Sequence, residues 1–142
     1  MASNLVTIEQ ACIHLRCDYE VDSSGAVASE DVPWLSMFIP AISEAVSLWL
    51  KDSWRLYEWE MDSNGEVLRD SGGDPVPMID SAGDPVVRWS VRSAVLVELA
   101  SQYRFREGEG TDNAVPSDAG YGYVLNKAST ALLAPLRKST VA

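Results

Sequence analysis

Residue types that build most catalytic and metal-binding sites are scarce in this sequence. One histidine and two cysteines occur among 142 residues, which leaves no histidine-rich metal cluster and no conventional triad signature. The Gly-x-Ser-x-Gly, phosphate-loop and His-Glu-x-x-His patterns are absent as well. We therefore predict a protein that is not an enzyme and binds no cofactor or metal, with His14 as a structural residue of a short helix.

Basic residues are also few, since 11 Lys and Arg stand against 21 Asp and Glu and the formal net charge is -10. Such a chain is repelled by nucleic acid and by anionic membranes, which argues against a dedicated DNA-binding module. The first ten residues lack the pattern of a secretory signal, and we expect no transmembrane stretch. Cys12 and Cys17 lie about 140° apart around a helix, so we expect reduced, cytosolic thiols rather than a disulfide.

Hydrophobic residues make up 46% of the sequence, which suits a single domain over residues 1–142 with one core. Their helical spacing predicts four helices at about 8–16, 31–52, 86–106 and 123–134. We expect a mainly α fold in which these helices pack as a four-helix bundle. The third helix should be central because it is apolar around most of its circumference. The tryptophans at helical spacings are expected mainly in this core: Trp34, Trp49, Trp54 and Trp89.

Several residues are expected to set the limits of the helices. Thr7 and Gln10 have the spacing of a capping box for the first helix. Pro40 should kink the second helix without ending it, because proline cannot donate a backbone hydrogen bond. Pro85 should open the third helix, and Pro135 should bend or end the fourth.

The segment between the second and third helices has a different pattern. Aromatic and apolar residues at 57, 59 and 61 alternate with acids and precede Asn64-Gly65, which is a hairpin signal. The sequence of residues 70–76 recurs at 80–86 with one change, and this repeat predicts a second turn. Eight acids and one Arg between positions 58 and 84 give the segment a charge of -7. We expect residues 57–84 to project from the helices as an inserted acidic β-hairpin arm or mobile loop.

Two further segments are predicted to be loops, residues 18–31 and residues 107–120, because both are rich in Gly, Ser and Asp and lack an apolar period. Asp- and Gly-rich turns also suggest a calcium site. They do not match the calcium-loop template, however, because the glycine comes too early and the closing bidentate Glu is missing. Ordinary turn chemistry is the favoured interpretation.

Four segments of the sequence occur in a characteristic order. The first has the form Thr-x-x-x-Ala-x-x-His-Leu-Arg and ends at Arg16, and an amphipathic stretch over residues 35–50 follows it. The third is an apolar helix that begins with Pro85 and ends in an aromatic residue and an Arg-Glu pair. The last has the form Leu-Leu-x-Pro-x-Arg and ends at Arg137.

Together these segments, which cover most of the chain, resemble the head-tail connector (adaptor) family of tailed bacteriophages. The resemblance implies a virion protein of the neck, assembled in the host cytoplasm, that forms a ring of about twelve copies beneath the portal protein. It also implies contact with the next neck or tail component and a channel through which genome DNA passes. An acidic channel would suit DNA passage because it does not bind phosphates. The long acidic insertion, Pro40 and the high negative charge depart from the family pattern and leave the role of the insertion open.

Two sets of residues are candidate contact sites. The basic tail, residues 135–142, is expected to swing free after Pro135 and to dock onto the portal through Leu136, Arg137 and Lys138. Contacts between subunits are expected from the following residues: Arg88, Arg92, Arg104, Arg106, Trp59, Asp80 and Asp84. The alternatives are a frayed terminus and a solvated helix face with local ion pairs.

Two other classes of function remain open. The chain could be a small acidic adaptor or regulatory binding protein outside virions, which would stay monomeric or dimeric. It could also be an enzyme that uses carboxylates such as Glu58, Glu60, Asp80 and Asp84. Their Gly- and Pro-rich setting argues against this, because catalytic carboxylates need a rigid and partly dry site.

Overall fold

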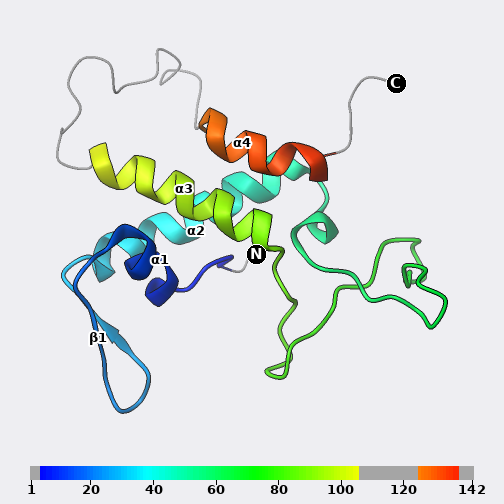
Figure 1. The fold of residues 1–142 in the computed structure, drawn as a ribbon, viewed down its shortest axis with the longest axis horizontal. Helices are drawn as coiled ribbons and strands as arrows, with labels where there is room; N and C mark the ends of the chain where they lie inside the picture. The colour runs from blue at the N-terminus through cyan, green and yellow to red at the C-terminus, as the bar shows by residue number, and fades with distance from the viewer. Residues whose placement is uncertain (1–3, 106–124, 138–142) are drawn as a thin grey trace.

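The computed structural model describes residues 4–105 and 125–137. In these residues the helices are α1 (Ile8–Leu15), α2 (Val32–Leu50), α3 (Trp89–Phe105) and α4 (Lys127–Leu133) (Figure 1). Shorter elements are the 3-10 helices η1 (Ser53–Leu56) and η3 (Ala134–Leu136) and the strands β1 (Glu20–Val21) and β2 (Val27–Ala28). The protein is therefore mainly α, as predicted.

The first helix begins at the predicted capping box. Thr7 Oγ1 accepts a hydrogen bond from the Gln10 N–H at 3.1 Å, and Gln10 Oε1 accepts one from the Thr7 N–H at 3.0 Å. The helix ends because Arg16 adopts a left-handed conformation with φ of 59°. The prediction of an irregular loop over residues 18–31 is wrong in part, because β1 and β2 pair there as an antiparallel hairpin.

The second helix supplies the largest share of the core. It continues through Pro40, so this proline does not end the helix. Ser43, which is buried, accepts a hydrogen bond from the Leu5 N–H at 3.1 Å and holds the N-terminal segment against α2. By length and mean hydropathy α2 is the one described helix that could cross a membrane. A buried core helix has the same composition, and α2 places these apolar side chains in the core: Leu35, Ile39, Ile42, Val46 and Leu50.

The third helix packs against α1, α2 and α4, and Val91, Ala94, Val95 and Leu99 are buried in the same core. It begins at Trp89, three residues later than predicted. The prediction that Pro85 opens this helix is wrong, because Pro85 still lies in the preceding segment, where it forms a β-bridge with Ile79. The α3 N-terminus therefore follows directly on the inserted segment.

The fourth helix is shorter than predicted and begins at Lys127. Asn126 caps it by accepting a hydrogen bond from the Ser129 N–H at 2.8 Å. Pro135 lies within η3, directly after α4. The predicted start of this helix at residue 123 and the predicted loop at 107–120 lie outside the described residues.

Candidate functional site

One turn geometry occurs four times, once in the β1–β2 hairpin and three times between residues 57 and 87. These two segments project from the helices. In each turn an aspartate Oδ1 accepts hydrogen bonds from the backbone N–H groups two and four residues further on, at 2.8–3.0 Å. The glycine three residues after each aspartate has φ between 79° and 88°, which a residue without Cβ adopts readily. The four aspartates are Asp22, Asp62, Asp70 and Asp80. All four begin an Asp-Ser-x-Gly sequence, which is the signal that the four turns share.

We call residues 57–87 the acidic arm. Two closed cycles of backbone hydrogen bonds hold it together. In the first cycle Glu58 donates to Val86, Val86 to Met78 and Met78 to Glu58, each at 2.8 Å. A second cycle connects residues 60, 76 and 68 in the same way at 2.9 Å. Three segments of the chain therefore meet at each level of the arm.

The arm differs from the predicted hairpin because its strands are reduced to single β-bridges. Pro75, Pro77 and Pro85 each take part in such a bridge, and proline has no N–H with which to continue a ladder. Pro75 is buried within the arm although Asp74, the residue before it, is exposed. The arm extends from the start of α3 away from α1 and α4 (Figure 1).

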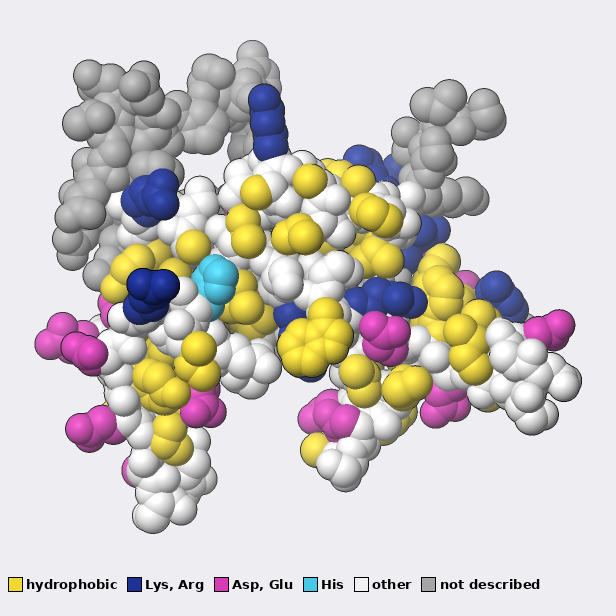
Figure 2. Space-filling model, viewed as in Figure 1, with side chains coloured by type: hydrophobic (Ala, Val, Ile, Leu, Met, Phe, Trp, Pro, Cys, Tyr) yellow, Lys and Arg dark blue, Asp and Glu magenta, His cyan; other side chains and the backbone are white. Residues whose placement is uncertain are grey.

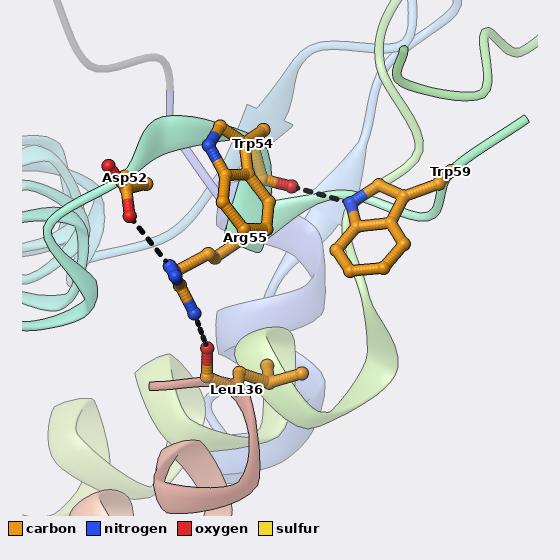
Figure 3. Close-up of polar contacts among 5 residues, drawn as sticks. All are labelled: Asp52, Trp54, Arg55, Trp59 and Leu136. Atoms are coloured by element: carbon orange, nitrogen blue, oxygen red, sulfur yellow. Dashed lines mark hydrogen bonds and ion pairs between the residues drawn. The ribbon is translucent and has the colours of Figure 1, made fainter. Parts of the chain in front are cut away.

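The base of the arm is built from Trp54, Trp59 and Arg88. The Trp59 Nε1–H donates to the Trp54 carbonyl at 2.8 Å (Figure 3). The Arg88 guanidinium lies 4.6 Å from the centroid of the Trp59 side chain and 3.6 Å from the Glu58 carboxylate. Arg88 and Trp59, both predicted as contacts between subunits, thus contact each other within one chain and join the arm to the helices.

The C-terminal segment is bound to the helices next to this base. The Arg55 Nη1–H donates to the Leu136 carbonyl at 2.7 Å, and Arg55 Nε pairs with the Asp52 carboxylate at 2.9 Å (Figure 3). The Arg137 guanidinium lies over the Trp49 side chain, 4.4 Å from its centroid. Leu136 also packs against the core.

The prediction that the tail swings free after Pro135 is therefore wrong for Leu136 and Arg137. Pro135 does not separate the tail from the helices, because η3 includes it and the two residues that follow are held by side chains of the body. Lys138, the third predicted docking residue, lies outside the described residues.

A groove runs along α3 between α1 and α4. It consists of two adjoining hollows that share His14, one of about 280 Å³ between α1 and α3 and one of about 410 Å³ that reaches α4. We call it the basic groove and define it by six residues: Ile13, His14, Trp89, Arg92, Arg104 and Lys127. The described residues that line it include three cations and neither Asp nor Glu.

The basic groove also exposes large apolar side chains. Trp89 is 75% exposed, contrary to its predicted place in the core, and Ile13 is 61% exposed. The Arg92 guanidinium lies 5.1 Å from the centroid of the Trp89 side chain. The groove thus contains two of the predicted subunit contacts, Arg92 and Arg104, whereas Arg106 lies outside the described residues.

Acidic and basic side chains are separated on the surface. Figure 2 shows Asp and Glu mainly on the two projections and Lys and Arg mainly over the helices. Asp80 and Asp84 both lie in the third turn of the arm and are exposed. Asp80 Oδ1 completes this turn, whereas Asp84 contributes its backbone N–H to it.

A polar hollow of about 760 Å³ lies between the end of α1, the β1–β2 hairpin and the end of α3. Tyr103 donates its hydroxyl hydrogen to Asp31 Oδ2 at 3.1 Å and accepts from Cys17 Sγ at 3.6 Å. Burial raises the pKa of the Cys17 thiol and of the Tyr103 hydroxyl. Burial also raises the pKa of the free Cys12 thiol, so both cysteines stay protonated near neutral pH. Sequence reasoning missed this cluster because its members are far apart in the chain.

Comparison with known proteins gives no relative: no protein-family model, curated protein or solved structure matches the chain. Within residues 4–105 and 125–137, His, Cys, Asp and Glu side chains form no group of three or more that could hold a metal ion. The acidic arm, the C-terminal segment and the basic groove are the surfaces with the most distinctive chemistry.

Proposed function

We propose that this chain is a structural subunit of the neck of a tailed bacteriophage, forming a ring beneath the portal that joins head to tail. The observation that carries the proposal is the order of four segments that resemble the connector family. Each of these segments supplies a helix of the fold, namely α1, α2, α3, and α4 together with η3. Their order in the chain is therefore also the order of the elements that make the core.

The four helices form one bundle around α3 in this proposal. Contacts of α3 with α1, α2 and α4 support it, as does the single hydrophobic cluster to which all four helices contribute. The acidic arm remains outside the bundle. A small body with a separate projection suits a protein that binds several neighbours at once.

The C-terminal segment is the proposed portal-docking surface. Leu136 and Arg137 are half-buried and held in place by Arg55 and Trp49. A segment that is already ordered loses less conformational entropy on binding than a free tail. Docking would therefore use Leu136 and Arg137 as part of a fixed surface, together with Lys138, the next residue in the sequence.

The charge distribution supports passage of DNA without specific binding. Residues 58–84 carry -7 of the net charge of -10, so an arm that faced the channel would repel phosphate. The proposal includes no catalytic activity, no cofactor and no membrane. A small acidic adaptor outside virions is the second candidate, and the same separation of charges would suit it if the chain remained monomeric or dimeric.

Capture by portal-bearing heads tests the proposal. Heads that carry the portal but lack the neck should retain the wild-type protein on sedimentation, and the Arg137→Ala/Lys138→Ala variant should bind at least about tenfold less tightly. Arg69→Ala, which removes an exposed arginine of the arm, is the matched control and should bind like wild type. Wild-type protein that is not retained by the heads would contradict the connector function, and retention of the double variant at the wild-type level would contradict the docking role of the tail.

A further inference from the structure

We propose that the acidic arm of one copy binds the basic groove of the next copy. This inference rests on the proposed ring of subunits and identifies the two surfaces that would connect neighbours. It assigns a role to the insertion, which the family resemblance leaves open. The proposal is argued from charge, from apolar exposure and from the direction of the arm.

The charges of the two surfaces are opposite. The arm carries eight acids and one arginine between residues 58 and 84, and the described lining of the groove has Arg92, Arg104 and Lys127 without an acid. The net charge of the protein is -10, so the groove is opposite in charge to the protein as a whole. Its best match within the chain is the arm, because complementary potentials steer partners together and fix their orientation.

Three acids of the arm are placed for such a contact. Glu66, Asp74 and Asp84 occupy the same position in the three turns of the arm, where their backbone N–H groups complete the turn. Their side chains are exposed. Contact with a basic surface therefore leaves the turns unchanged, whereas Asp62, Asp70 and Asp80 use their carboxylates to form the turns.

Exposed apolar side chains also make the arm and the groove complementary. The arm exposes Met61, Met78 and Ile79, and the groove exposes Ile13 and Trp89. Exposed aromatic and methionine side chains beside cations are typical of protein interfaces, in which a few such residues supply most of the affinity. Burial of Trp89 by a neighbouring arm would remove the largest exposed apolar side chain of the described residues from water.

The direction of the arm favours a second copy over the same chain. The arm leaves the body at the start of α3 and extends away from α1 and α4 (Figure 1), and in the described part of the chain the hydrogen bonds of residues 60–84 run to other arm residues. Each copy then presents one arm and one groove. A contact between two different surfaces repeats from copy to copy and closes into a ring when the rotation permits.

A charge-swap experiment tests this contact. The arm variant Glu66→Lys/Asp74→Lys/Asp84→Lys and the groove variant Arg104→Glu/Lys127→Glu should each weaken self-association at least about tenfold in analytical ultracentrifugation. Combining the two variants in one chain should restore association, since the three new lysines of the arm then face the two new glutamates of the groove. The control combines the groove variant in one chain with Asp18→Lys/Glu20→Lys/Glu30→Lys, the same charge change on and beside the β1–β2 hairpin, and should not restore association.

A cross-link separates this inference from the proposed ring. Ser81→Cys in the arm and Ser93→Cys in the groove, both at exposed positions, should be joined by a short bismaleimide only when the two variants are mixed at assembling concentration. Rings without cross-link or charge rescue would overturn the arm–groove contact and leave the ring intact. A cross-linked dimer or filament without rings would support the contact and overturn the ring. Absence of any association between copies would overturn both.

Discussion

Glu98 of α3 and Ser129 of α4 are joined in the core, where Ser129 Oγ–H donates to Glu98 Oε2 at 2.8 Å and both side chains are buried. The backbone N–H of Asn126 donates to the same carboxylate oxygen at 3.0 Å. Glu98 therefore holds the N-terminus of a helix that has only seven residues. Helices of this length are not stable on their own, so this link fixes where α4 packs against α3.

Loss of this link should destabilise the whole fold. We expect Ser129→Ala to lower the free energy of unfolding by about 1–3 kcal/mol, because the buried Glu98 carboxylate loses one of its hydrogen-bond donors. Thr130→Ala is the control, since within the described residues the Thr130 hydroxyl bonds to carbonyls of the same helix turn, those of Asn126 and Lys127. It should change stability by about 0.5 kcal/mol or less. Urea unfolding measures both, and equal effects would contradict the role given to Glu98.

The arm allows a comparison between neighbouring glycines. Gly73 has φ of 84°, so Gly73→Ala should destabilise the arm by about 1 kcal/mol. Gly72 has no positive φ, and a Cβ there would meet Asp70 Oδ1 at 3.4 Å, an ordinary contact. Hydrogen exchange of the Leu68 and Val76 amides, which lie in the second cycle, should therefore be faster in Gly73→Ala than in Gly72→Ala. The reverse order would show that these turns do not support the arm.

Arg55 should be required to hold the C-terminal segment. Arg55→Ala removes the bond to the Leu136 carbonyl and the pair with Asp52, and charged hydrogen bonds of buried side chains contribute about 1.5–3 kcal/mol. We expect trypsin to cleave after Arg137 faster in this variant than in wild type. Arg69→Ala, which removes an arginine bonded to the Gly73 carbonyl within the arm, should leave the cleavage rate after Arg137 unchanged. Protection that persists in Arg55→Ala would contradict the anchoring.

The two thiols should react slowly in the native protein. Burial raises the pKa of Cys12 and of Cys17, and only the thiolate attacks alkylating reagents. Native protein should therefore consume iodoacetamide more slowly at pH 8 than the urea-unfolded chain does. Because the folded state favours the neutral thiol, its contribution to stability is present below the unfolded pKa of about 8.5 and is lost as pH rises above it. Equal alkylation rates in the folded and the unfolded protein would contradict a raised pKa of the thiols in the folded state.

Local signals in the sequence predicted those features that depend on neighbours in the chain. The capping box of Thr7 and Gln10 is of this kind, and so is the length of α2. The start of α3 was missed because Pro85 fits a first-turn position equally well, and only its bridge with Ile79 places it in the arm. The β1–β2 hairpin was missed because its strands have only two residues each, too few to show an alternating pattern.

Contacts between distant segments could not be read from the sequence. Arg55 and Leu136 are 81 positions apart, and nothing local indicates that the tail is bound to η1. The sequence singled out Arg92 and Arg104, whereas Lys127 and the exposure of Trp89 depend on how α1 and α4 pack against α3. Arg88 and Trp59 have side chains typical of protein interfaces, but they contact each other inside the chain at the base of the arm.

Direct observation of the assembled protein tests the central claim that this chain is a ring-forming neck subunit. Sedimentation over a wide concentration range, alone and with purified portal, combined with negative-stain electron microscopy, should show closed rings of one size with about twelve copies. A protein that remains monomeric or dimeric under all these conditions would contradict the claim and would favour the small acidic adaptor instead.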